Sequence, residues 1–236
     1  MTRPLVLDQP QTMRGIVAIP VRTGIVQPGE DLCAIVAQAV RGIARPGDVV
    51  AVSETALAIA QGQTLPAQAV RPSKLAHFIC RRAGPLATVN QPESLQLVID
   101  RVGAPKVVFA CVLQALGRLV GLRGLFYRVM GEAITAIDGY TGTMPPFDRV
   151  IVFEPRDPAA FAESFFQHTG IDCAVVDAND LAPAKLLGAS KNAQRNIVAR
   201  ALDENPHGNS DEQTPIVVLK WRGDGASPLL RGDARA

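Results

Sequence analysis

The sequence predicts an α+β (mixed α/β) protein in which helices pack on a sheet. Short apolar runs typical of strands alternate with longer segments whose apolar residues recur every three to four positions. Two of the runs, 49–52 and 173–176, are apolar without interruption, which is typical of strands buried on both faces. Both runs end in polar turns, and ligands bind at such strand ends in open sheets.

The N-terminal half is expected to begin with a strand at 16–21, followed by a helix that ends near Arg41. Glu30 and Asp31 are expected in the first turn of that helix, because acidic side chains there complement the helix dipole. After the strand at 49–52, helices are expected in a small-residue segment ending near Gly62, from Pro72 to Arg82 and from Pro92 to Val102.

The C-terminal half begins with a long apolar segment at 107–130, and there is no acidic residue between Arg101 and Gly131. The basic side chains of this region either bind an anionic substrate or belong to a buried helix and pair with acids elsewhere. The remaining elements expected are a strand at 150–153, a helix after Pro158, a strand at 173–176, a helix at 191–203 and a strand at 215–220.

Composition excludes several classes of function. The net charge of +2, from 24 basic and 22 acidic residues, gives no basic face for nucleic acid. The longest apolar stretch is too short and too polar to span a membrane, and the N-terminus has no signal-peptide core. The cysteines form no metal or redox motif, so we expect buried reduced thiols in a cytoplasmic protein: Cys33, Cys80, Cys111 and Cys173. Neither a P-loop nor a dinucleotide fingerprint occurs.

Two acidic turns are candidates for a metal centre. Asp177, Asn179 and Asp180 follow an apolar strand, and Asp138 follows another apolar stretch and precedes Thr141. Carboxylate oxygens suit Mg²⁺, which takes one or two of them and shares its other positions with phosphates and water. The alternative is that each acidic residue only caps a turn.

A third candidate lies where the strand at 49–52 passes into a helix. Ser53, Glu54 and Thr55 offer hydroxyls and backbone N–H groups at this junction, which is typical of an anion site. Capping of the helix by the serine or threonine explains the same residues equally well.

Taken in order, these segments resemble the γ-glutamyl ligase family that elongates the deazaflavin coenzyme factor 420. The resemblance runs from about Gly15 to Gly223. The N-terminal motifs resemble a nucleotide loop, Ile19-Pro20-Val21 with Gly29-Glu-Asp-Leu32, and a phosphate turn, Gly47-Asp-Val-Val-Ala-Val-Ser-Glu-Thr55 with Ala60-Gln-Gly62, followed by Arg71-Pro-Ser73. Two later motifs resemble metal-bearing turns, Ala136-Ile-Asp138-Gly-Tyr-Thr141 and Val175-Val-Asp177-Ala-Asn179. The last, Pro215-Ile-Val-Val-Leu, resembles the closing strand of the family.

The sequence also departs from the family pattern. Where the phosphate turn continues Ser-Lys-Ala-Glu-Gly-Arg in the family, the chain has Ala58-Ile-Ala-Gln-Gly-Gln63, so the lysine and the arginine are both replaced. Arg22, Arg123 or Arg128 is the conjectured source of the missing positive charge. These changes indicate a divergent branch of the family.

The resemblance implies a fold of the deazaflavin γ-glutamyl ligase type with two subdomains. The chain is expected to consist of an N-terminal extension at 1–14, a ligase-like domain at 15–223 and a disordered tail at 224–236. Whether the ligase-like domain divides into two near 104–149 is left open. It also implies an enzyme that uses GTP or ATP with Mg²⁺ or Mn²⁺ to join L-glutamate to a small-molecule carboxylate through an acyl phosphate. The acceptor is open between a deazaflavin, a folate or other pterin, and another carboxylate.

The residues that the resemblance assigns fall into two groups. Those expected to bind the metal are Asp138, Asp177 and Asp180, of which Asp138 and Asp177 are catalytic. Those expected to bind the nucleotide are Pro20, Val21, Ser53, Glu54, Thr55, Thr141 and Asn179. A homodimer is expected, without nucleic-acid or membrane partners. Two alternatives stay open, a non-catalytic relative that binds a nucleotide or an anionic metabolite and a structural scaffold without a ligand.

Overall fold

The computed structural model describes residues 11–13, 15–83, 90–122, 124–135, 137–139, 145–179, 182–203, 206–207, 213–223 and 227–230. These residues form two compact units. The first comprises residues 1–63 and 155–236, and the second is the insertion Thr64–Glu154 between them. The segment 104–149, where the sequence left a split open, lies wholly within the second unit.

The first unit is built on a six-stranded mixed sheet with the strand order β1-β2-β9-β3-β7-β8. Its strands are β1 (Gln11–Met13), β2 (Ile16–Val21), β3 (Val49–Ser53), β7 (Asp172–Asn179), β8 (Ala182–Ala189) and β9 (Ile216–Trp221). Only β3 and β7 pair in parallel, and the other pairs are antiparallel. The predicted mixed sheet of an α+β protein is therefore confirmed.

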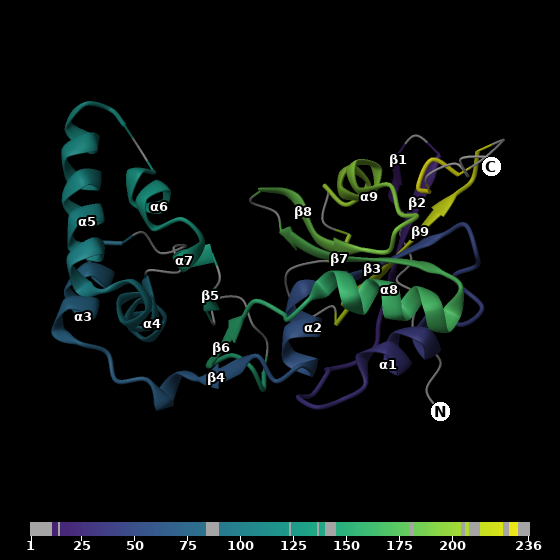
Figure 1. The fold of residues 1–236 in the computed structure, drawn as a ribbon, viewed down its shortest axis with the longest axis horizontal. Coiled ribbons are helices and arrows are strands. Elements are labelled where there is room, and N and C mark those ends of the chain that lie inside the picture. The colour runs from purple at the N-terminus through teal and green to yellow at the C-terminus, as the bar shows by residue number, and fades with distance from the viewer. Residues whose placement is uncertain are drawn as a thin grey trace. The chain divides into compact units, whose positions relative to one another are not determined.

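Helices cover both faces of this sheet, as Figure 1 shows with α9 above it and α1 and α8 below it. Val50 and Val52 of β3 pack with α1 (Leu32–Ala39), α2 (Glu54–Ala60) and α8 (Pro158–Thr169). Val49 and Ala51 point to the other face and pack with α9 (Arg195–Ala201). Burial on both faces explains why this strand is an uninterrupted apolar run.

The second unit combines helices with a small antiparallel sheet of order β4-β6-β5. Its strands are β4 (Thr64–Pro66), β5 (Ile137–Gly139) and β6 (Val150–Phe153). Its helices are η1 (Ala67–Ala69), α3 (Lys74–Cys80), α4 (Pro92–Val102), α5 (Ala104–Leu119), α6 (Leu125–Met130) and α7 (Glu132–Thr135). A core of its own, which includes Leu95, Val107 and Ile151, holds these elements together.

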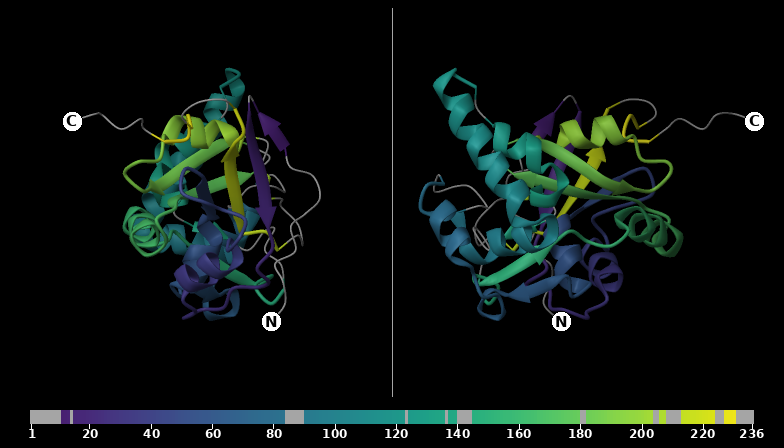
Figure 2. Two further views of the ribbon diagram at one scale, coloured as in Figure 1. Left: turned by 90° about the vertical axis from the view of Figure 1, so that its right-hand side faces the viewer. Right: turned by 60° about the vertical axis from the view of Figure 1, so that its left-hand side comes forward.

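The apolar segment predicted at 107–130 folds as two helices, α5 and α6, rather than as one element. The break falls at Gly121 and Gly124, which have φ values of 77° and 76°. Glycine adopts this left-handed backbone without the steric cost that a side chain brings, so these two positions end one helix and start the next. The longer helix, α5, is the long teal helix in the right-hand view of Figure 2.

Strand β8 was not predicted, because its sequence, APAKLLGA, has no β-branched residue and no alternating pattern. It forms by pairing with β7, and Gly188 lies opposite Val175. A Cβ at Gly188 would lie 2.3 Å from the carbonyl carbon of Pro158 at the start of α8. The glycine is therefore required for the close approach of α8 to the sheet.

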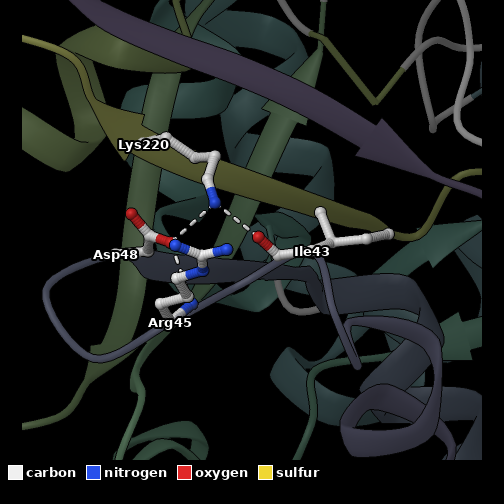
Figure 3. Close-up of polar contacts among 4 residues, drawn as sticks. All are labelled: Ile43, Arg45, Asp48 and Lys220. Carbon is white, nitrogen blue, oxygen red and sulfur yellow. Dashed lines mark hydrogen bonds and ion pairs between the residues drawn. The ribbon is translucent and has the colours of Figure 1, made fainter.

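The turn before β3 is fixed by a partly buried ion pair (Figure 3). Lys220 Nζ lies 3.0 Å from Asp48 Oδ2, and the same ammonium group donates a hydrogen bond to the carbonyl of Ile43. Asp48 Oδ2 also accepts from the backbone N–H of Arg45 at 2.9 Å. These bonds attach the turn to β9 and so set where β3 begins.

Within the predicted tail, residues 227–230 pack against the first unit. Leu229 is buried beside α9, and its carbonyl accepts a hydrogen bond from Gln194 N–H at 2.6 Å. Among the described residues, no helix has both the length and the apolar character needed to cross a membrane.

Candidate functional site

The carboxyl ends of β2, β3 and β7 come to one edge of the sheet. Strand β9 runs antiparallel to both β2 and β3, so those two strands point the same way, and β7 is parallel to β3. Val21 and Val52 both lie opposite Ile216, so β2 and β3 end at the same level. This edge is where an open sheet of this kind binds a ligand.

The junction of β3 and α2 lies at this edge and carries three of the predicted site residues. Ser53, Glu54 and Thr55 are half-buried. The backbone N–H of Ser53 donates to the carbonyl of Pro215 at 2.8 Å, which fixes the strand end. The Ser53 side chain makes no capping hydrogen bond to α2, so capping does not account for the serine.

Asp177 lies in the neighbouring strand β7, two residues before that strand ends at Asn179. Ser53 is in register with Val176, so the next residues along the two parallel strands are Glu54 and Asp177. Asp177 is half-buried. The register therefore places Glu54, the first residue of α2, and Asp177 of β7 one position beyond the Ser53–Val176 pair, next to Ser53 and Thr55 in the chain.

The donor groups at this edge suit a hard divalent cation, because carboxylate and hydroxyl oxygens are the ligands that Mg²⁺ and Mn²⁺ take. Within the part of the chain that the structure describes, no group of three or more His, Cys, Asp or Glu side chains is arranged as a metal site. One or two carboxylates are enough for Mg²⁺ when phosphates and water complete its shell. Asp177 and Glu54 thus fit the predicted cation together with a nucleotide.

The structure does not place the other residues predicted to bind metal or phosphate at the β3–α2 junction. Asp138 lies in β5 of the second unit, so its expected association with Asp177 in the first unit stays a prediction. Asn179 is the last residue of β7. Asp180 and Thr141 lie outside the described residues.

Pro20 and Val21, which were expected to bind the nucleotide, lie in the buried part of the sheet. Both side chains are buried, and Val21 packs in the core between the sheet and α1.

The loop that follows them comes back to α2, where Gly29 N–H donates to the carbonyl of Ala60 at 2.9 Å. Asp31 then caps α1 by accepting from Ala34 N–H at 3.1 Å, so the helix starts after the two acids and not with them.

Arg156 is a candidate that the sequence did not reveal. With the Gln63 amide oxygen turned toward it, the guanidinium donates through Nε and Nη2 at 2.9 and 2.8 Å. Gln61 holds the backbone of the same residue, since its Nε2 donates to Arg156 O at 2.8 Å and its Oε1 accepts from Arg156 N–H at 2.6 Å. Two glutamines of the altered phosphate turn thus hold an arginine that is distant in the sequence, 95 positions from Gln61.

The position of the family lysine is taken by an uncharged residue in this chain. Ile59 is buried on α2 and offers no charge. Of the conjectured replacements, Arg22 follows β2, Arg128 lies on α6 in the second unit, and Arg123 lies outside the described residues. Arg156 is exposed and is held at the end of α2 itself. Only a tertiary contact reveals it, because nothing near residue 156 in the sequence points to α2.

His207 supports the segment that enters β9. Its Nδ1 donates to the carbonyl of Thr214 at 3.2 Å, and the Thr214 hydroxyl donates back to the carbonyl of His207. Burial lowers the pKa of His207 to about 4, against a smaller opposite effect of the Thr214 hydrogen bond. The imidazole is therefore neutral near pH 7. It holds the residue beside Pro215, whose carbonyl binds Ser53 N–H.

All four cysteines are free thiols, of which Cys80 and Cys173 are buried and Cys33 and Cys111 are half-buried. Burial raises the pKa of each, and that of Cys80 reaches about 11 with a smaller contribution from the charge of Glu93. The thiols are therefore protonated near pH 7 and do not supply a thiolate nucleophile.

Comparison with known proteins gives one family. A family model described as F420-0:Gamma-glutamyl ligase matches residues 20–178, which include the end of β2, the β3–α2 junction, the whole second unit and Asp177. No curated protein matches the chain. The matched range contains Asp138 and Asp177 and ends before Asn179.

Proposed function

Because the chain belongs to the F420-0:gamma-glutamyl ligase family, and so to a family of ligases, we propose that it joins L-glutamate to a carboxylated cofactor through a γ-glutamyl amide bond. The reaction would consume a nucleoside triphosphate, GTP or ATP, and require Mg²⁺ or Mn²⁺. The acceptor favoured by the family assignment is F420-0. The observation that carries the proposal is the parallel register of β3 and β7, which places Ser53 opposite Val176 and so Glu54 and Asp177 on neighbouring segments.

The chemistry requires activation of a poor electrophile. An oxygen of the acceptor carboxylate attacks the γ-phosphorus, the nucleoside diphosphate leaves, and an acyl phosphate forms. The amine of L-glutamate then attacks the acyl carbon, loses a proton and displaces phosphate. A divalent cation would neutralise the negative charge that gathers on the phosphates during transfer.

Residues of this chain would divide the work. Asp177 and Asp138 would bind the cations, with Asp180 assisting, and Glu54, just beyond the end of β3, is a further carboxylate on the segment next to Asp177. The hydroxyls of Ser53 and Thr55 would bond to phosphate oxygens, as would Thr141 and Asn179. Arg156 would supply the positive charge that the family lysine and arginine provide, because it is the guanidinium held at the altered turn.

The role of Arg156 gives a direct prediction. Arg156→Ala is expected to raise the KM for the nucleotide by about 10-fold or more, because one charge-assisted contact to phosphate is removed. Steady-state phosphate release at varied nucleotide concentration measures this change. Arg200→Ala, which removes an exposed arginine from α9, is the matched control and should leave the KM unchanged. An unchanged KM in Arg156→Ala would contradict the assignment.

The function itself is tested by mass spectrometry. The purified full chain is incubated with F420-0, L-glutamate, GTP or ATP and Mn²⁺, and we expect a product heavier by one glutamyl unit together with one phosphate released per bond formed. If F420-0 is unchanged, the same assay with a cell extract and labelled glutamate identifies another acceptor. No labelled product under any of these conditions would reject the ligase.

The second candidate function is a relative that binds a nucleotide or an anionic metabolite without turnover. Ile59, buried where the family has a lysine, favours it. This candidate predicts that a nucleotide binds in calorimetry without metal and is recovered intact from every substrate mixture.

A cytoplasmic location stays a prediction.

A further inference from the structure

Lys185 lies directly across from Asp177 on the neighbouring strand. Strands β7 and β8 pair antiparallel, and in their register Asp177 is opposite Lys185. Residues opposite each other in an antiparallel pair project from the same face of the sheet, with Cβ atoms about 4.5–5.5 Å apart. Both residues belong to the first unit. A lysine therefore lies beside the carboxylate that is proposed to bind the cation.

The neighbours of this pair show which face of the sheet carries it. In β7, Val175 packs in the core with α1, α2 and α8, whereas Val176 packs on the opposite face with α9. Side chains alternate along a strand, so Asp177 projects to the same face as Val175. Leu187 of β8 packs in that same core. Lys185 and Asp177 thus lie on the face of the sheet on which α2 and α8 pack.

The ammonium group of Lys185 is available to a ligand. Lys185 is exposed, and among the residues that the structure describes no ion pair involves its side chain. Lys220 is a contrast, since its ammonium is used by Asp48. A cross-strand ion pair with Asp177 therefore does not account for Lys185, and its charge is left for a third group.

The altered phosphate turn lacks two positive charges of the family pattern. Ile59 and Gln63 stand where the family has a lysine and an arginine. Arg156, held at the end of α2, replaces one of these charges. A nucleoside triphosphate with one divalent cation still carries net negative charge, so a second basic side chain near the cation would stabilise it further. Lys185 is a basic residue that the register of β7 and β8 places beside Asp177.

The segments that carry Arg156 and Lys185 pack on each other. Helix α8 begins at Pro158, two residues after Arg156. A Cβ on Gly188, three residues beyond Lys185 in β8, would lie 2.3 Å from the carbonyl carbon of Pro158. Figure 1 shows α8 running along the β7–β8 side of the sheet. Both basic residues therefore belong to segments fixed next to the strand of Asp177.

We propose that Lys185 binds the terminal phosphate of the nucleoside triphosphate, beside the cation held by Asp177. This inference rests on the nucleotide binding proposed above. The lysine ammonium is a compact point charge on a flexible four-carbon stem, which suits phosphate. Phosphoryl-transfer sites combine such a lysine with a divalent cation on the same phosphates. The competing ligand is the α-carboxylate of L-glutamate, which the test separates from phosphate.

The first measurement is nucleotide binding without turnover. Calorimetry of the full chain with Mn²⁺ and the β,γ-imido analogue of GTP or ATP gives the Kd. Lys185→Gln is expected to raise this Kd by about 10-fold or more, because one charge-assisted contact to phosphate is lost. Lys185→Arg, which keeps the charge, should restore most of the affinity. Lys191→Gln is the matched control, since Lys191 is an exposed lysine beyond the opposite end of β8, and its Kd should equal that of the wild type.

The second measurement separates the two anionic substrates. Lys185→Gln should raise the KM for the nucleotide and leave the KM for L-glutamate unchanged, and the reverse result would overturn the inference by assigning the ammonium to the amino acid. The unliganded variant should unfold at the temperature of the wild type, because the side chain is exposed.

Failure of this inference differs from failure of the proposed function. A wild type that binds the analogue, with an equal Kd in Lys185→Gln, overturns the role of Lys185 and leaves the ligase standing. A wild type that neither binds the analogue nor forms a product rejects the ligase, and the role of Lys185 with it.

Discussion

Asp177→Asn is expected to lower glutamate-dependent phosphate release by at least about 100-fold, a loss of roughly 3 kcal/mol of transition-state stabilisation. Asp177 is half-buried in β7, on the strand next to β3, whose last residue Ser53 precedes Glu54. The amide of asparagine is similar in size to the carboxylate, so packing is retained while the negative charge is lost. A neutral ligand holds a divalent cation, and through it the phosphates, less well.

The readout separates this role from a structural one. Thermal unfolding with Mn²⁺ and a non-hydrolysable nucleotide should stabilise the wild type and should stabilise Asp177→Asn much less, while the two unliganded proteins unfold at similar temperatures. Asp148→Asn, at an exposed position in the second unit, is the matched control and should behave as the wild type. Asp138→Asn is expected to show the same loss as Asp177→Asn. Phosphate release that persists undiminished in both variants would show that the assigned metal centre is wrong.

The elements that could be predicted from the sequence are those whose pattern is local. The strand β2, the helix α4 and the strand β6 have the predicted limits, because their apolar periodicity and bounding residues are continuous in the chain. The β3–α2 junction was found because a polar turn follows a buried strand there. Asp177 was singled out for the same reason, but the predicted turn is wrong, because Asp177 lies within β7, which continues to Asn179. Their proximity is a consequence of the parallel pairing of β3 and β7.

What could not be predicted depends on contacts between distant segments. Strand β8 has no strand pattern of its own and forms because β7 supplies its hydrogen-bond partners. Arg156 gains its place only through Gln61 and Gln63, and no local signal links these residues. The buried face of α5 could not be predicted either, because apolar residues occur on more than one side of this helix and the sequence does not show which side the unit buries.

The stability of the chain is expected to fall as the pH is lowered from about 7 to about 4, and His207 is expected to contribute roughly 3 kcal/mol of that fall. Burial lowers the pKa of His207 to about 4 in the folded protein, from an ordinary value of 6.5. Between these two values the unfolded chain binds a proton that the folded chain does not bind. Acid therefore favours unfolding in this window, and the contribution of His207 is constant above and below it.

Urea unfolding at several pH values between about 7 and 4 measures this effect. Other groups also titrate in this range, so the quantity compared is the difference between the wild type and His207→Gln, which cannot take up the proton. The pH dependence should be weaker in this variant and unchanged in the control His168→Gln, whose imidazole is exposed on α8. Equal pH dependence in His207→Gln and the wild type would contradict the assignment. A weaker dependence would show that His207 is held neutral in the folded protein, where its imidazole bonds to Thr214 at the entrance to β9.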